Sequence, residues 1–204
     1  MKKNAVLALL VLGSAACFAS HAKRYFELRA SSPPAGGPAL TRTLLLDRVD
    51  ISEFYDDFRI VYRLSPTEVN YYPYDFWTEK PSRLIHHMVL ERLLVPGRFL
   101  RIDTEAGKDP ADWQLKMRVF CIEEVDEGDQ WFGRLSMAFE VVDLKTEAVI
   151  ATRSFDRREP LGRKDVTRLP AVLSSILLAE IDAFLGELAA KSRDEPLARH
   201  SPVA

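Results

Sequence analysis

Residues Trp113–Glu124 read WQLKMRVFCIEE, and their apolar and polar side chains alternate almost without interruption. A period of two predicts a β-strand with one buried face and one exposed face. The segment Gln130–Leu144 alternates in the same way, and an acidic turn at Glu123–Asp129 separates the two. We therefore expect a long antiparallel hairpin, followed by a further strand at Glu147–Asp156. The apolar side of the first strand comprises Trp113, Leu115, Met117, Val119 and Cys121.

Two segments carry apolar residues at helical spacing, and each predicts a helix with one apolar face. The first is Pro81–Leu94, where Pro81 suits the first turn of a helix. The second is Thr167–Lys191, and it has the clearest periodicity in the chain. Its apolar stripe comprises Leu169, Val172, Leu173, Ile176, Leu177, Ile181, Phe184, Leu185 and Leu188. Because each helix has only one apolar face, both are expected to cover the same sheet.

Four shorter strands are expected nearer the N-terminus, at Tyr25–Leu28, Thr43–Val49, Arg59–Leu64 and Glu68–Tyr72. The turn residues between the last two predict a hairpin. The sum is an α+β domain of two layers, in which a mixed, mainly antiparallel sheet is covered by two amphipathic helices.

The composition is that of an ordinary globular protein. The chain has 204 residues, of which 47% are hydrophobic and 28% charged, and its net charge is −2. This balance predicts no broad electrostatic attraction to nucleic acid or to an anionic membrane. The chain contains two cysteines, so Cys121 has no partner within it if Cys17 is lipidated or removed. We therefore expect one domain without disulfides.

The first sixteen residues have the order of a bacterial secretory signal. A cationic start precedes the apolar run Ala5–Leu12 and the small residues Gly13–Ala16. The apolar run is too short to span a membrane. Two cleavage sites remain open. Cys17 after small residues resembles the site of a lipoprotein, although Ser14 stands where Leu is usual, and cleavage after Ala22 is the alternative.

From Thr43 onward, the order of features resembles the ABC-type transport auxiliary lipoprotein family, the PqiC-like lipoproteins that accompany MCE-type lipid transport systems. The resemblance covers roughly residues 25–190. Its most specific part is Trp77 followed by a helix that opens with Pro-Ser-Arg-Leu at Pro81–Leu84. Further matching segments are Thr43–Val49, Ile60–Arg63 and Val69–Tyr72.

The resemblance implies a TolB N-terminal-like fold and a non-enzymatic protein without cofactor or metal. It also implies that the protein binds an MCE partner and that homo-oligomeric rings are possible. The corresponding organisation is a signal over 1–16, a tether lipidated at Cys17 over 17–24, a domain over 25–191 and a disordered tail over 192–204. Phe18 after the cysteine favours the periplasmic face of the outer membrane. The alternative function is a soluble periplasmic carrier of a lipid or small ligand, which a large apolar cavity would favour.

Five residues are candidates for partner binding, since Tyr, Trp and Arg are favoured at interfaces. They are Tyr72, Tyr74, Trp77, Arg63 and Arg83. The alternative is structural: the aromatic side chains fill the core beneath the first helix, and Arg63 pairs with Glu68 or Asp75 inside its hairpin.

Other polar groups favour structural roles. His86 and His87 are adjacent on a helix and point about 100° apart, so a joint metal site is not expected. The spacing of the acidic turn Glu123–Asp129 departs from that of a calcium loop and is typical of a solvated hairpin tip. The basic stretch Arg153–Arg168 is expected to be a solvated loop, with contact to anionic lipid as the alternative. The sequence has no Gly-x-Ser-x-Gly, His-Glu-x-x-His or phosphate-loop motif.

Overall fold

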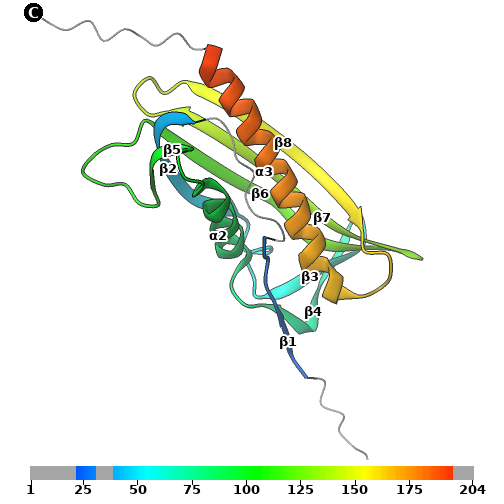
Figure 1. Ribbon diagram of the computed structural model, residues 1–204. Helices are drawn as coiled ribbons and strands as arrows, with labels where there is room; N and C mark the ends of the chain where they lie inside the picture. The colour runs from blue at the N-terminus through cyan, green and yellow to red at the C-terminus, as the bar shows by residue number, and fades with distance from the viewer. Residues whose placement is uncertain (1–21, 31–38, 195–204) are drawn as a thin grey trace, which may run out of the picture.

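The computed structural model describes residues 22–30 and 39–194, in which two helices cover one face of a mixed eight-stranded sheet (Figure 1). The expected α+β class is thus confirmed. The strands are β1 (Arg24–Phe26), β2 (Leu40–Ile51), β3 (Arg59–Ser65), β4 (Glu68–Trp77), β5 (Phe99–Asp103), β6 (Trp113–Glu127), β7 (Gln130–Asp143) and β8 (Val149–Pro160). The helices are α2 (Pro81–Leu93) and α3 (Leu169–Asp194), with a 3-10 turn at Val166–Arg168 before α3.

Strand β6 is the centre of the sheet. One of its edges pairs with β7 in the expected antiparallel hairpin, from Trp113 to Glu127. Its other edge is divided, because β2 pairs with its first half and β3 pairs in parallel at Glu124 and Val125. The antiparallel ladders β6–β7 and β7–β8 are the longest. Parallel pairing is nevertheless more widespread than expected: β1–β4, β2–β5, β2–β6 and β3–β6 are all parallel.

The core lies between the helices and the sheet, as the apolar stripes predict. Phe139 of β7 and Phe184 of α3 are fully buried, and their rings stack with centroids 5.4 Å apart. Gly133 lets α3 approach closely, since a Cβ there would lie 2.9 Å from Val172 Cγ1. Helix α3 is apolar and long enough to cross a membrane, but 61% of its most apolar window is buried inside the domain. It is therefore a core helix.

Helix α2 is held to α3 by an ion pair between Arg92 and Asp182, in addition to apolar contacts. The Nε of Arg92 donates to Oδ1 of Asp182 at 2.6 Å. Arg98, just after α2, donates to the carbonyl oxygen of Arg92 at 2.7 Å. Both helices thus form one layer, as expected.

Strand β6 differs from the prediction after Val119. The register with β7 shifts between Val119 and Cys121, so Phe120 is an extra residue that forms a β-bulge. The bulge reverses the alternation and places Cys121 opposite Ser136, on the face away from the helices. Cys121 is buried, but it lies outside the main core cluster, which corrects the expectation that it shares the apolar side.

Two further predictions are corrected, and one strand is missing from the predictions. Glu123 and Glu124 are not in a solvated turn, because β6 continues to Glu127 and both side chains are buried. The basic stretch is only partly a loop, since β8 runs to Pro160 and includes Arg153. Strand β5 is not predicted by the sequence pattern at all.

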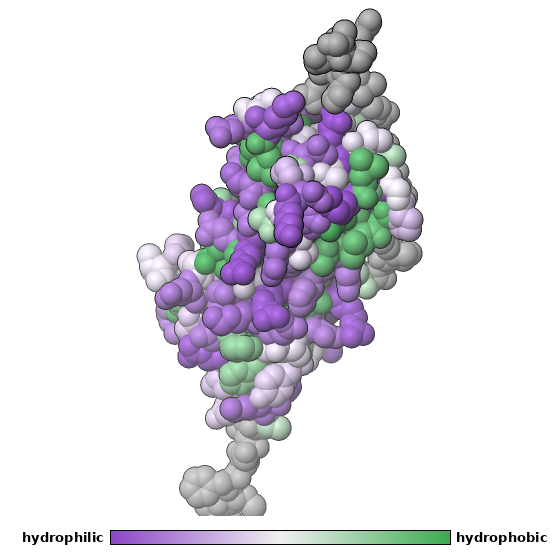
Figure 2. Space-filling view, turned by 90° about the vertical axis from the view of Figure 1, so that its left-hand side faces the viewer, coloured by the Kyte–Doolittle hydropathy of each residue, from purple (hydrophilic) through white to green (hydrophobic). Residues whose placement is uncertain are grey.

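The domain is elongated (Figure 1). Strand β1 lies at one end, and β5 and the C-terminal end of α3 lie toward the other. The face in Figure 2 is mostly hydrophilic, with small separate apolar areas. The signal, Cys17, the Ser/Pro/Gly-rich segment 31–38 and residues 195–204 lie outside the described residues. Helix α3 continues through residue 194, so residues 192–194 of the predicted tail are helical.

Candidate functional site

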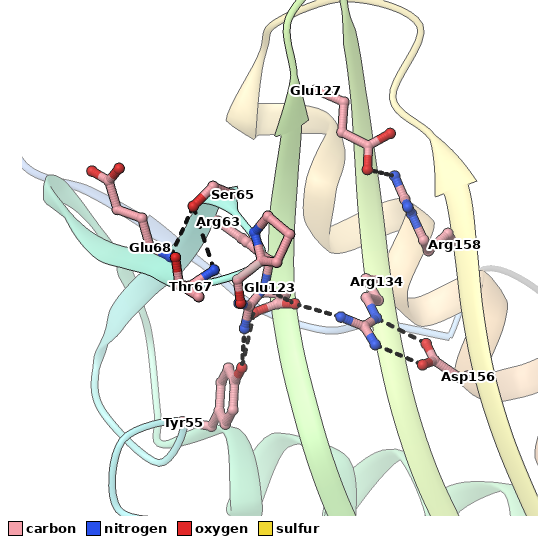
Figure 3. Close-up of polar contacts among 11 residues, drawn as sticks. Tyr55, Arg63, Ser65, Thr67, Glu68, Glu123, Glu127, Arg134, Asp156 and Arg158 are labelled. Atoms are coloured by element: carbon pink, nitrogen blue, oxygen red, sulfur yellow. Dashed lines mark hydrogen bonds and ion pairs between the residues drawn. The ribbon is translucent and has the colours of Figure 1, made fainter.

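A surface notch lies between the turn that joins β3 to β4 and the end of the β6–β7 hairpin (Figure 3). We call it the arginine notch, because Arg63, Arg134 and Arg158 line it together with Pro66 and Val125. Its volume is about 460 Å³. The three arginines come from β3, β7 and β8, so strands far apart in the sequence build one site.

Glu123 is the anchor of the arginine notch, and its side chain has no exposed surface. It accepts hydrogen bonds from Arg63 Nε at 2.8 Å and Arg134 Nη1 at 3.2 Å. The Tyr55 hydroxyl donates to its other oxygen at 2.9 Å. Burial and the neighbouring carboxylate raise the pKa of Tyr55, so its hydroxyl stays protonated and remains a donor. The carboxylate of Glu123 is therefore fully satisfied.

The arginines of the notch are held in place from several sides. Arg63 also donates to the carbonyl oxygen of Pro66 at 3.1 Å, and its hydrogen bond to Glu123 raises its pKa. Arg134 forms a two-pronged ion pair with Asp156, with distances of 2.9 and 2.6 Å. Bidentate pairs fix the guanidinium plane. The alternative expectation that Arg63 pairs with Glu68 or Asp75 is wrong, because it pairs with Glu123 across the sheet.

Arg158 is the most exposed arginine of the notch. It pairs with Glu127 at 2.8 Å and lies over the ring of Phe132, 4.5 Å from its centroid. The site therefore presents ordered guanidinium groups beside the exposed Leu64. Asp126 and Glu127 also line the notch, so its charges are balanced. The site therefore offers a partner both guanidinium and carboxylate groups, and these side chains are ordered before binding.

Glu124 faces the opposite side of the sheet from Glu123. It is fully buried and accepts a hydrogen bond from the Tyr72 hydroxyl at 2.7 Å, while its other oxygen has no partner among the described residues. Burial raises the pKa of Glu124. Tyr72, a candidate for partner binding, is half-buried, and its ring packs 4.7 Å from that of Tyr62. Its hydroxyl therefore satisfies a buried carboxyl and is not free for a partner.

The other candidates for partner binding are dispersed. Trp77 is 2% exposed and belongs to the core, so its side chain is not available at the surface as the partner-binding hypothesis requires. Tyr74 is 43% exposed. Arg83 is largely exposed and pairs with Glu79 at 3.0 Å. It lines a different hollow of about 600 Å³ beside α2, together with Arg48 and the two histidines. The five candidates therefore do not form one surface.

The family described as the ABC-type transport auxiliary lipoprotein component matches residues 26–182. The chain belongs to this family. Its members are auxiliary lipoproteins of ABC transport systems, so the expected resemblance is confirmed. No curated protein matches the chain.

Solved structures show the fold alone, because their sequences differ widely from this one. A DUF330 protein of Xanthomonas campestris is 17% identical with a TM-score of 0.73, over 84% of this chain and 97% of its own. An uncharacterized protein is 15% identical with a TM-score of 0.66, over 82% of this chain and 99% of its own. The PelC dodecamer of Paraburkholderia phytofirmans is 17% identical with a TM-score of 0.45, over 76% of this chain and 92% of its own.

The histidines of α2 and Cys121 lie outside the arginine notch. Burial lowers the pKa of His86, while His87 is exposed. Burial raises the pKa of the Cys121 thiol to about 12, so the thiolate is disfavoured. Among residues 22–30 and 39–194, no group of three or more His, Cys, Asp or Glu could hold a metal ion.

Sequence reasoning missed Glu123, Arg134 and Tyr55 as members of one cluster. One signal was present: Glu123 and Glu124 are adjacent, and adjacent residues of a strand face opposite sides. If the strand continues past Cys121, at least one of them must approach the core. The contribution of Arg134 could not be foreseen, because it depends on the register after the bulge.

Proposed function

We propose that the protein is a non-enzymatic docking component of an ABC-type lipid transport system, tethered by lipid on Cys17 to the periplasmic face of the outer membrane. In this role it binds the MCE-domain partner of the system and holds it near the membrane. The observation that carries the proposal is family membership over residues 26–182, since the family consists of transport auxiliary lipoproteins.

We place the partner contact at the arginine notch. Arg63 is the one residue of the original candidates that lines it, and its guanidinium is fixed by Glu123 and Pro66. Arginine is enriched at interfaces, and a group that is already ordered loses little entropy on binding. Tyr74 and Arg83 remain proposed contacts outside the notch. Self-assembly into a ring would let several notches act on one partner.

The alternative of a soluble periplasmic carrier has less support. The stacked rings of Phe139 and Phe184 fill the space between α3 and the sheet. The hollow beside α2 and the arginine notch both lie at the surface and are lined by charged residues, whereas a lipid site is usually enclosed and mostly apolar.

Site-specific photocrosslinking in cells tests the partner contact. A photoreactive residue at Leu64, which lines the notch, is expected to capture a membrane protein with an MCE domain. The same group at Leu100 on β5, also an exposed leucine, is the control and should capture none. Arg158→Glu should weaken the crosslink from Leu64, whereas Arg118→Glu, an exposed arginine outside the notch, should not. Equal capture at Leu64 and Leu100, or no capture of an MCE protein at Leu64, would contradict the proposal.

A further inference from the structure

A strip of aromatic rings and two cations runs along the sheet face opposite the helices, at the β1 end. Tyr25 of β1 is in register with Phe76 of β4, and their ring centroids are 5.8 Å apart. The neighbours of Phe76 along the strand, Asp75 and Trp77, are buried toward the helices, so Phe76 points away from them. Lys23 Nζ lies 5.2 Å from the centroid of Phe76.

The strip continues from β4 to the loop before β3. Arg59 is in register with Phe76, and its guanidinium lies over the ring of Tyr71 at 3.9 Å. The ring of Tyr71 packs in turn against Phe54, with centroids 5.0 Å apart. We call these four rings, with Lys23 and Arg59, the aromatic strip.

The chemistry of the aromatic strip is that of a membrane–water interface. Tyr25 is 63% exposed, and the other rings are half-buried. Tyrosine rings prefer the headgroup level, and lysine and arginine beside them reach phosphate groups with their charged ends. Arg59 pairs with Asp57 at 2.9 Å, so its charge is compensated, and Lys23 adds a positive charge.

The position of the strip also points to a membrane. Tyr25 follows the proposed lipid-bearing Cys17 by eight residues, which span at most about 28 Å when fully extended. The strip is therefore always within a short distance of an anchored lipid. Figure 1 places β1 at the end of the molecule where the described chain begins, and Figure 2 shows a small apolar area at this end.

We propose that the aromatic strip lies against the headgroup layer of the membrane that carries the lipid anchor, and that it orients the domain there. This inference rests on the proposed anchoring at Cys17. Lipid chains alone would leave the domain free to rotate about its tether, whereas the strip gives it a fixed membrane-facing end. Strand β5 and the C-terminal end of α3 then face away from the bilayer (Figure 1).

Depth-dependent fluorescence quenching tests the orientation. The mature protein purified from membranes is reconstituted in vesicles of phosphatidylethanolamine and phosphatidylglycerol that contain a headgroup-labelled quencher. A fluorophore is attached to a cysteine at position 27, by Glu27→Cys, or at position 100, by Leu100→Cys; both positions are exposed, and buried Cys121 stays unlabelled. We expect quenching at position 27 to exceed that at position 100 by about twofold or more.

Variants separate the strip from the anchor. Tyr25→Asp should reduce the difference between the two positions without releasing the protein from the vesicles, because the acyl chains and the short tether still hold this end of the domain near the membrane. Leu100→Asp, an exposed substitution on β5, should leave the quenching at position 27 unchanged. An acylated protein that is quenched equally at both positions, or whose quenching is unaffected by Tyr25→Asp, overturns the strip but not the anchor. A mature protein without acyl groups overturns both. A protein partner that crosslinks to position 27 in place of lipid also overturns the strip.

Discussion

Arg63 and Glu123 form an ion pair of 2.8 Å between strands β3 and β6, although the two residues are 60 positions apart. The pair lies at the point where β3 replaces β2 as the neighbour of β6. It therefore closes the divided edge of the sheet and at the same time orders an arginine of the proposed partner site. Stability and docking are linked through this contact.

The first prediction concerns Glu123. Glu123→Gln should lower the free energy of unfolding by about 3 kcal/mol, because it leaves the half-buried guanidinium of Arg63 without its carboxylate and removes one of the two carboxylates that Arg134 contacts. Urea unfolding followed by circular dichroism measures this. Glu127→Gln is the control: Glu127 pairs with Arg158 at the surface, so its loss should change the urea midpoint little. Equal effects of the two substitutions would refute the anchoring role of Glu123.

The second prediction concerns the pH dependence of stability due to Glu124. Burial raises the pKa of this carboxyl in the folded state, so its contribution is fully present below the usual pKa of glutamate and is lost as the pH rises through the folded pKa. Glu124→Gln mimics the protonated form. It should therefore be about 1 to 3 kcal/mol more stable than the wild type at high pH, and this advantage should vanish at low pH.

Urea midpoints of both proteins from acid to mildly alkaline pH provide the measurement. The difference between the two proteins isolates Glu124, because carboxyls whose pKa is lowered in the fold, such as Asp156 beside Arg134, affect both equally. An advantage of Glu124→Gln that grows as the pH falls would show that the sign is wrong.

The third prediction concerns the packing of α3 on the sheet. Gly133→Ala should destabilise the protein by about 1 to 3 kcal/mol, because the new methyl group would lie 2.9 Å from Val172 and 3.1 Å from Leu169. Gly186→Ala on α3 is the opposite case. Apart from its own helix backbone and chain neighbours, no atom of the described residues lies within 4 Å of its added Cβ, and alanine favours the helix by up to about 1 kcal/mol. Thermal unfolding of both variants should give shifts of opposite sign.

The fourth prediction concerns Cys121. Its thiol is buried and has a pKa raised to about 12, so it should not react with a thiol reagent near neutral pH in the folded protein. Reaction should appear only on unfolding in urea, with the same midpoint as circular dichroism. Fast reaction in the absence of urea would mean that this part of β6 is open to solvent.

The central hairpin and α3 could be predicted, because their apolar residues recur with the period of a strand or of a helix. The alternation in Trp113–Val119 and in β7 predicts the central hairpin, and the apolar stripe of Leu169–Leu188 predicts α3. The bulge at Phe120 has no signal in its own sequence, because it depends on the pairing with β7. Strand β5 is short and half-exposed, and it forms mainly because β2 offers it an edge.

The candidate site could be predicted only in part, for the same reason. Arg63 and Tyr72 are where the sequence places them, on β3 and β4. Their partners, Glu123 and Glu124, come from a strand that the sequence pattern ends too early. The burial of Trp77 follows from its place at the end of β4, in the core cluster, and a strand ending at Tyr72 does not include this position.

The intact mass of the mature protein from bacterial membranes, measured beside a Cys17→Ala variant, tests the proposed tethered docking component most directly. We predict a chain that begins at Cys17 and carries acyl groups, and the loss of both the acyl mass and the membrane association in the variant. A chain that begins at Lys23 and is soluble in the periplasm would contradict the account and would favour the carrier function.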